Sequence, residues 1–453
     1  MLSMKSSHVL VLALALTMAE GMLARLLAEE AAPLPPAGGG VTSTAADQAA
    51  VTEEEKPWPS EFFRSLVFSG YLETSYTYNF QSPDPPAGVE NVGRIFDIWD
   101  NEFMLNAFML NVERPVDEEH WVGFKVTPFI GEDAEITQAY GLFKTNETVE
   151  TPIDTDGDGQ FDAIEESEVT VSDGNFDLLN AYISGYVPQT RTTIKLGKME
   201  TTVGAEVIQA PYNDNFSRSY LFGFAIPYTH TGIMAFQPVL TRAAGTVDML
   251  TLGLGISNGW DNVKDLNDAK LFHFMASFAP CDEFSVAGNL LYSTSEQADD
   301  SSHARTLFDL VATVKPIPTF QDLKFLLNFD WAGEQGAAVN GGYAHWYGFS
   351  GITKLDFSLS RESAKDWYVA MRGEFFNDAD GARTSGLVPN DGLFLYELTF
   401  TLGYRPTTFL LLRTEVRYDK ADQDVFYHDG GSAVGEPNEN HQTTLAFDAS
   451  FLF

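Results

Sequence analysis

A two-residue alternation of apolar and polar side chains recurs in strand-length segments from Leu66 to the C-terminus. It constrains the fold more than any other feature. The clearest segment is FLLLRTEVRYD, whose two faces are Leu410, Leu412, Thr414, Val416 and Tyr418, and Leu411, Arg413, Glu415, Arg417 and Asp419. LKFLLNFDWA at 323–332 and WYVAMRGEF at 367–375 repeat it. Since successive side chains of a β-strand point to opposite faces, the pattern predicts an all-β chain. The strands of a soluble β-sandwich and those of a membrane-spanning β-barrel both alternate in this way, so the pattern alone does not separate these two classes of fold.

The segments predict sixteen strands, an even number as expected for a bacterial transmembrane barrel. They run over about 66–80, 101–114, 120–131, 175–187, 192–199, 231–241, 246–258, 270–280, 283–295, 304–316, 322–334, 343–359, 366–377, 392–405, 407–420 and 441–453.

The connections between these strands alternate in length. Short turns such as PQTR and CDE follow every even strand, and longer, mostly acidic loops such as SEQADDSSHA follow every odd strand. A sandwich has no reason to keep this asymmetry, whereas a transmembrane barrel has short periplasmic turns and long extracellular loops. Beyond the N-terminal region no apolar run is long enough for a membrane-spanning helix. The sequence therefore predicts a transmembrane antiparallel β-barrel of about 16 strands.

The N-terminal region predicts export. Residues 1–28 contain a short basic start, an apolar run from Val9 to Ala19 and small residues beyond it, as in a secretory signal peptide; a retained anchor is the alternative. Residues 29–60 are rich in Ala, Pro, Gly and acid, which predicts a disordered periplasmic linker. The barrel is expected over 61–453, with an acidic insertion at about 145–172.

The formal net charge is −37, which argues against nucleic acid as a partner because phosphate binding needs a basic surface. An acidic surface favours cations. The single cysteine, Cys281, excludes an intrachain disulfide.

The stretch DTDGDGQFDAIE has the ligand spacing of an EF-hand calcium loop. The candidate ligands are Asp154, Asp156, Asp158, the Gln160 carbonyl, Asp162 and Glu165. A calcium sensor moves two flanking helices, and neither flank here predicts a helix. The motif lies between the third and fourth predicted strands, on the extracellular side. We therefore expect a structural Ca²⁺ that stabilises an extracellular loop, with a solvated acidic loop as the alternative.

Barrel width grows with strand number, and sixteen strands leave an aqueous channel; a count nearer twelve would favour a narrower or plugged barrel. The segment 200–230 is too apolar and aromatic for a solvated loop, so we expect it to fold into the lumen. Packing over the barrel mouth or against a neighbouring subunit is the alternative. The candidate pore and constriction residues are Asp214, Arg218, Arg372, Glu374, Arg413, Glu415 and Arg417. For the candidates that lie in predicted strands, the alternative is that they are ordinary solvated residues lining the barrel.

Three stretches carry a resemblance to a known family: FSGYLETSYTYNFQSPD, RIFDIWDNEFMLNAFMLNVERP and KMETTVGAEVIQAPYNDNFSRSYLFGFAIPYTHTG. They resemble the OmpL-like family of β-barrel porins of the bacterial outer membrane, and the similarity covers most of Leu66 to Phe453. It implies a porin-type barrel without giving a substrate. The final strand, which ends in Phe453, resembles the barrel-insertion signal of outer-membrane proteins, and the position of 200–230 resembles the constriction loop of general porins. The resemblance does not imply calcium.

We expect outer-membrane lipid, lipopolysaccharide and small hydrophilic solutes or ions as partners, with a homotrimer left open. No histidine lies in a catalytic motif, and H-E-x-x-H and G-x-S-x-G do not occur, so we do not expect an enzyme. The alternative to a porin is an adhesin or envelope-attachment barrel whose acidic loops are bridged by calcium.

Overall fold

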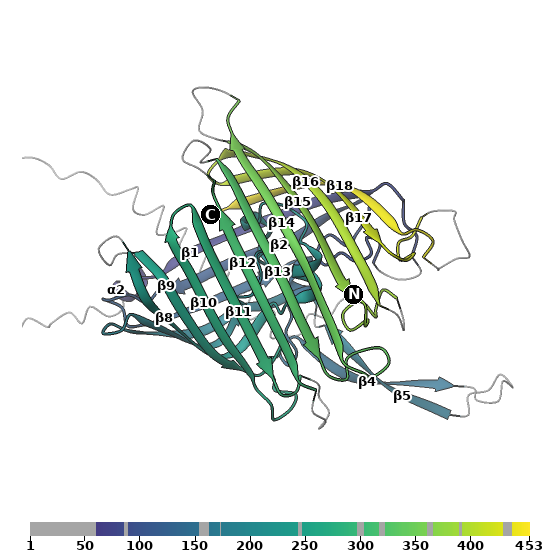
Figure 1. Cartoon of the computed structure of the whole chain (residues 1–453), viewed down its shortest axis with the longest axis horizontal. Helices are drawn as coiled ribbons and strands as arrows, with labels where there is room; N and C mark the ends of the chain where they lie inside the picture. Colours follow the sequence, from purple (N-terminus) through teal and green to yellow (C-terminus); the bar gives the residue numbers. More distant parts are fainter. Residues whose placement is uncertain are drawn as a thin grey trace, which may run out of the picture. The chain divides into compact units, whose positions relative to one another are not determined.

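Sixteen antiparallel strands close into one barrel in the computed structural model of the chain (Figure 1). The structure describes residues 60–85, 89–153, 163–172, 174–242, 247–296, 303–316, 322–359, 366–388, 392–428 and 437–453. The barrel strands are β1 (Val67–Asn79), β2 (Glu102–Arg114), β3 (Val122–Ile130), β6 (Phe176–Val187), β7 (Thr192–Glu200), β8 (Thr229–Arg242), β9 (Val247–Ser257), β10 (Leu271–Cys281), β11 (Phe284–Ser293), β12 (Arg305–Val314), β13 (Leu323–Glu334), β14 (Ala344–Phe357), β15 (Trp367–Asp378), β16 (Leu393–Thr407), β17 (Leu410–Ala421) and β18 (His441–Leu452). The ring closes where β1 pairs with β18, with Tyr71 opposite Leu452. The predicted fold class and strand count are confirmed.

The barrel strands place apolar side chains outward and many polar ones inward. On β17, Val416 is 43 % exposed whereas Arg417 is 1 % exposed. Val416 lies opposite Phe400 of β16. Thr414, two residues earlier on the same face of β17, lies opposite Phe447 of β18. Both phenylalanines face outward. A continuous apolar outer surface is stable where lipid rather than water covers it. The alternation that predicts the strands therefore also sets which face meets the membrane.

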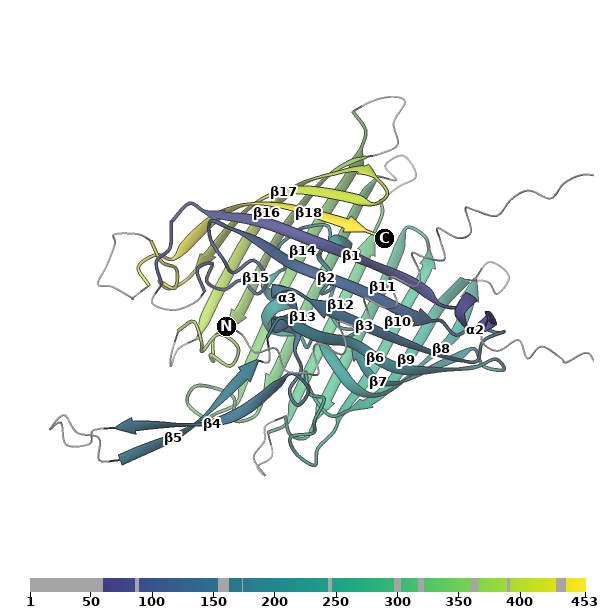
Figure 2. The same ribbon diagram turned by 180° about the vertical axis from the view of Figure 1, so that it is seen from behind.

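The two edges of the barrel carry different connections. One edge has the connections of two to nine residues, 115–121, 188–191, 243–246, 282–283, 315–322, 358–366 and 408–409, which we call the short turns. The other has the connections of nine to 45 residues, 80–101, 131–175, 201–228, 258–270, 294–304, 335–343, 379–392 and 422–440, which we call the long connections. In outer-membrane barrels the short turns face the periplasm. Figure 2 shows the wall formed by β1, β2, β3, β6 and β7.

The connection between β3 and β6 contains a sheet of its own. Helix α3 (Glu132–Thr137) is followed by β4 (Lys144–Ile153) and β5 (Ala163–Ser172), which pair antiparallel outside the barrel sheet (Figures 1 and 2). The sequence predicts an acidic loop here and not a hairpin. Its signal is the Thr-, Val- and Glu-rich composition of the two strands, since β-branched residues favour extended backbone.

The remaining helices are short. Helix α2 (Ser60–Arg64) precedes β1, and η1 (Ala210–Tyr212) and η2 (Leu221–Ala225) lie between β7 and β8. Among the described residues no helix is both long and apolar enough to cross a bilayer. The predicted signal peptide and nearly all of the predicted linker fall in residues 1–59, outside the described residues.

Candidate functional site in the barrel lumen

The connection between β7 and β8, residues 201–228, runs inside the barrel, and we call it the inward segment. It contacts inward-facing side chains on strands far apart around the ring. Thr202 Oγ1 donates a hydrogen bond to Asn289 Oδ1 on β11 at 3.0 Å. Asn215 Nδ2 donates to Thr401 Oγ1 on β16 at 2.7 Å. The segment therefore lies in the lumen and not over the barrel mouth.

Arg413 on β17 holds the inward segment by its backbone. Its Nη1 donates to the carbonyl oxygens of Ala210, Asn213 and Asn215 at 2.8, 3.3 and 3.1 Å. Its Nε and Nη2 donate to the two carboxylate oxygens of Asp448 at 2.8 and 2.9 Å. The guanidinium thus joins the barrel wall to three peptide groups, and the residue is only 2 % exposed.

Two further wall arginines repeat this arrangement. Arg372 Nη1 donates to the carbonyl of Ser217 at 2.6 Å, and Arg417 Nη1 donates to the carbonyl of Arg218 at 2.5 Å. Arg372 also pairs with Glu206 of the inward segment at 2.7 Å. Both arginines are fully buried.

Wall carboxylates bind the amides of the same segment. Glu415 accepts from the backbone N–H groups of Phe216 and Ser217 at 2.7 and 2.9 Å. Glu374 accepts from Leu221 N–H at 3.3 Å. Hydrogen bonds with one ionised partner are roughly twice as strong as neutral ones. The wall therefore satisfies both the donors and the acceptors of an irregular backbone, which makes its burial possible.

Two of the predicted pore residues, Asp214 and Arg218, lie within the inward segment, and their surroundings differ. Asp214 pairs with Lys324 on β13 and lies 3.7 Å from the ammonium of Lys354 on β14; its side chain is 10 % exposed. The Arg218 guanidinium lies over the ring of Phe96 at 4.3 Å and is buried.

All seven predicted pore residues lie on the lumen side of the barrel wall or in the inward segment. Their contacts join the wall to the inward segment. Those that are buried are Arg218, Arg372, Glu374, Arg413, Glu415 and Arg417. Contact between any of the seven and a permeant solute stays a prediction. Strand periodicity identifies the inward face, but it does not show what covers that face.

Other long connections also turn inward, and the sequence did not predict this. Arg94, between β1 and β2, donates to Asp419 Oδ2 on β17 at 2.6 Å. Arg383, between β15 and β16, donates to the carbonyl of Phe224 at 2.7 Å and lies over the ring of Trp260 at 5.2 Å. The available signal was the presence of arginine and aromatic residues in otherwise acidic loops.

The lumen wall of β9–β12 differs between its two halves. Near the long-connection edge, Leu271, Leu291 and Leu307 are buried in an apolar cluster that includes residues of the inward segment. Near the short-turn edge the inward-facing side chains are small and partly exposed, and include Thr251, Ser277, Ser285 and Thr313. Water therefore reaches the inner wall on the short-turn side.

The predicted calcium ligands lie outside the described residues. They are Asp154, Asp156, Asp158, Gln160 and Asp162, together with the side chain of Glu165, whose backbone lies in β5 opposite Thr151. Within the described ranges, no group of three or more His, Cys, Asp or Glu residues is arranged to hold a metal ion.

A closed barrel of sixteen strands, with an apolar outer surface and a lumen narrowed by an inward segment, defines an outer-membrane channel of the porin class. The chain belongs to the family described as "Putative beta-barrel porin-2, OmpL-like", whose model matches residues 65–453. The resemblance seen in the sequence is thereby confirmed. Porins are channels and not enzymes, so the expected outer-membrane location and non-enzymatic role are confirmed as well.

Solved structures share the fold at low sequence identity. The anion-selective porin from Comamonas acidovorans is 11% identical, with a TM-score of 0.50 over 86% of this chain and 99% of that one. The outer membrane channel DcaP of Acinetobacter baumannii is 11% identical, with a TM-score of 0.50 over 86% and 97%. OprB of Pseudomonas putida at high pH is 11% identical, with a TM-score of 0.51 over 87% and 96%. No curated protein matches the chain significantly.

Proposed function

We propose that the chain forms a channel for passive diffusion of small hydrophilic solutes or ions, and that the inward segment narrows it. The observation that carries this proposal is the water-accessible inner wall of β9–β12 beside the inward segment. Small hydroxyl side chains on that wall accept hydrated solutes without selecting one chemical group. Lipid and lipopolysaccharide at the outward face, and a homotrimer, belong to the same proposal.

Folded protein reconstituted into a planar bilayer should give discrete current steps in potassium chloride, because sixteen strands enclose a wide lumen. Protein denatured before addition is the control. Liposome swelling with sugars and amino acids then ranks the solutes by size. If correctly folded protein gives no steps, the channel proposal fails and the adhesin alternative is favoured.

We also propose that the acidic insertion binds structural calcium. The hairpin β4–β5 supports this proposal, since it pairs Ile153 with Ala163 and so brings the two ends of the segment 154–162 together. A loop closed in this way loses less conformational freedom when a cation gathers its carboxylates.

Calorimetry on the full chain should detect calcium binding with a dissociation constant on the order of 10⁻⁴ to 10⁻³ M. The double variant Asp156→Asn, Asp158→Asn should lose it, because two of the ligands then carry no charge. Asp322→Asn, elsewhere in the chain, is the matched control. No heat of binding to the parent protein, or equal binding to the double variant, would contradict the proposal.

A further inference from the structure

Two lysines on neighbouring parts of the inner wall face the lumen near the short-turn edge. Lys125 on β3 lies opposite Tyr182 of β6, and Lys195 on β7 lies opposite Ser184 of the same strand. Tyr182 and Ser184 are both inward-facing and buried. Leu196, next to Lys195, faces outward and is 58 % exposed. Strand β6 therefore separates two ammonium groups that point into the same space.

In the part of the chain that the structure describes, neither of these ammonium groups forms an ion pair. Among the described residues, no carboxylate oxygen lies within 4.0 Å of either one. Other inner-wall lysines are paired: Lys198 lies 2.8 Å from Asp177, and Lys324 pairs with Asp214. Within the described ranges these two lumen-facing ammonium groups are thus without an ion pair.

The two lysines line one open cavity of about 190 Å³. The ammonium of Lys195 lies 4.9 Å from the ring centre of Tyr182 and 5.6 Å from that of Phe236, so cation–π attraction holds it at the wall. Glu200 also lines the cavity and keeps its charge, since among the described residues its carboxylate accepts hydrogen bonds only from the neutral amides of Asn180, at 2.7 Å, and Gln209, at 2.5 Å. It forms no ion pair with either lysine, so both ammonium groups remain able to bind a further carboxylate.

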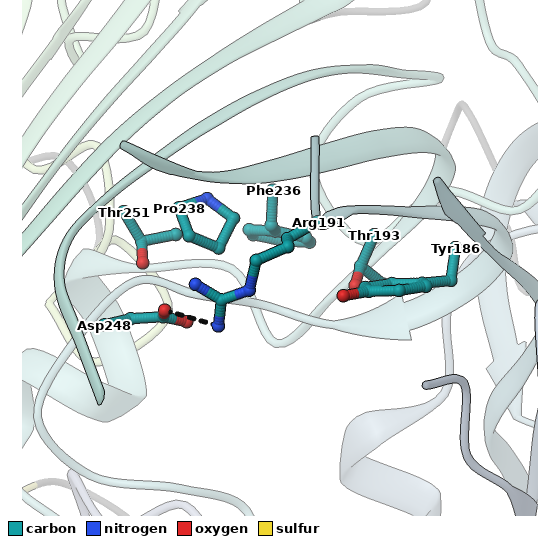
Figure 3. Close-up of a pocket in the computed structure, with 7 residues that line it drawn as sticks. All are labelled: Tyr186, Arg191, Thr193, Phe236, Pro238, Asp248 and Thr251. Atoms are coloured by element: carbon teal, nitrogen blue, oxygen red, sulfur yellow. Dashed lines mark ion pairs between the residues drawn. The ribbon is translucent and has the colours of Figure 1, made fainter. Parts of the chain in front are cut away.

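A neighbouring cavity gives an internal comparison (Figure 3). It has a volume of about 200 Å³ and shares Phe236 with the first. Its arginine, Arg191, is neutralised by Asp248 at 2.8 Å, as Figure 3 shows. The two cavities have similar volumes, but the charge of the arginine is paired and the charges of the two lysines are not.

We propose that Lys125 and Lys195 form a binding site for the carboxylate of a small organic anion with an apolar body. The carboxylate lies between the two ammonium groups, and the apolar body packs against the rings of Tyr182 and Phe236 and the side chains of Met199 and Met234, which line the same cavity. The site assigns a class of solute to the proposed channel. This inference rests on the proposed channel function, because a solute would occupy this position during passage.

Calorimetry tests the site without requiring conduction. Benzoate is the probe, added to the full chain folded in detergent, and it should bind saturably. The double variant Lys125→Gln, Lys195→Gln should bind at least about tenfold more weakly, since hydrogen bonds to charged groups are lost. Lys270→Gln is the control, because it removes the same charge at the long-connection edge of the barrel, where Lys270 pairs with Asp265. No benzoate binding by the parent, or equal binding by the double variant, would overturn the proposal.

Bilayer recordings separate this inference from the proposed function. In a gradient of potassium benzoate, the reversal potential of the parent should shift toward benzoate permeability relative to the double variant. A parent that conducts with the same reversal potential as the double variant would overturn the site and leave the channel function standing. A parent that binds benzoate in calorimetry but never conducts would overturn the channel function and keep the site.

Discussion

Replacing Arg413 with alanine will destabilise the barrel and release the inward segment. The change removes the donor to three carbonyl groups and leaves Asp448 without its guanidinium partner. The change also removes the positive charge beside Glu73, whose side chain is fully buried and lies 3.5 Å from Arg413 Nη2. Breaking a buried ion pair by removing one partner costs about 3–5 kcal/mol. Urea unfolding in lipid vesicles, followed by tryptophan fluorescence, measures the loss.

Limited proteolysis of the same variant should show new cleavage within 201–228. Arg242→Ala is the matched control, because Arg242 pairs with the exposed Asp282 in a turn and surface pairs contribute less than about 1 kcal/mol. Parent-like unfolding of the Arg413 variant, together with an uncleaved segment, would show that Arg413 does not anchor it.

Replacing residues 206–226 with a short Gly/Ser linker will at least about double the unit conductance, because the removed chain vacates a lumen that sixteen strands hold open. The barrel should still close, since Glu200 and Thr229 already lie opposite each other in the β7–β8 pairing. Single-channel recording in potassium chloride measures the change.

The control for this deletion places the same linker in the connection between β13 and β14, in place of the exposed residues 339–342. It should leave the unit conductance near that of the parent. An unchanged conductance after removal of 206–226, in protein that still folds, would place the narrowest point of the channel elsewhere.

The strands were predictable because each barrel strand has two different environments. One face meets lipid and the other meets the lumen, so the alternation extends along the strand. The predicted strand at 175–187 became β6 (Phe176–Val187), and the one at 407–420 became β17 (Leu410–Ala421). The asymmetry of the connections then favoured a membrane barrel over a sandwich, and the structure agrees.

The hairpin β4–β5 was harder to predict because it belongs to neither environment. Its strands lie outside the barrel sheet, so no face repeats the lipid pattern. The inward course of Arg94 and Arg383 was missed for a related reason. The exposure of a loop is predicted from the composition of the loop itself. Its burial, however, depends on contacts with segments elsewhere in the chain.

The sequence by itself determined the barrel, its strand count, its lipid face and the charged character of its lumen, because these follow from local periodicity. Only the tertiary structure decided what those charges do. Arg413 reads as solvated lining in its own strand, yet it binds the carbonyl of Ala210, 203 positions earlier in the chain. Lys125 and Lys195 read as ordinary strand lysines, and only the register of β3, β6 and β7 brings them to one cavity. Local patterns specify which face a side chain occupies, whereas its partner depends on how distant segments pack.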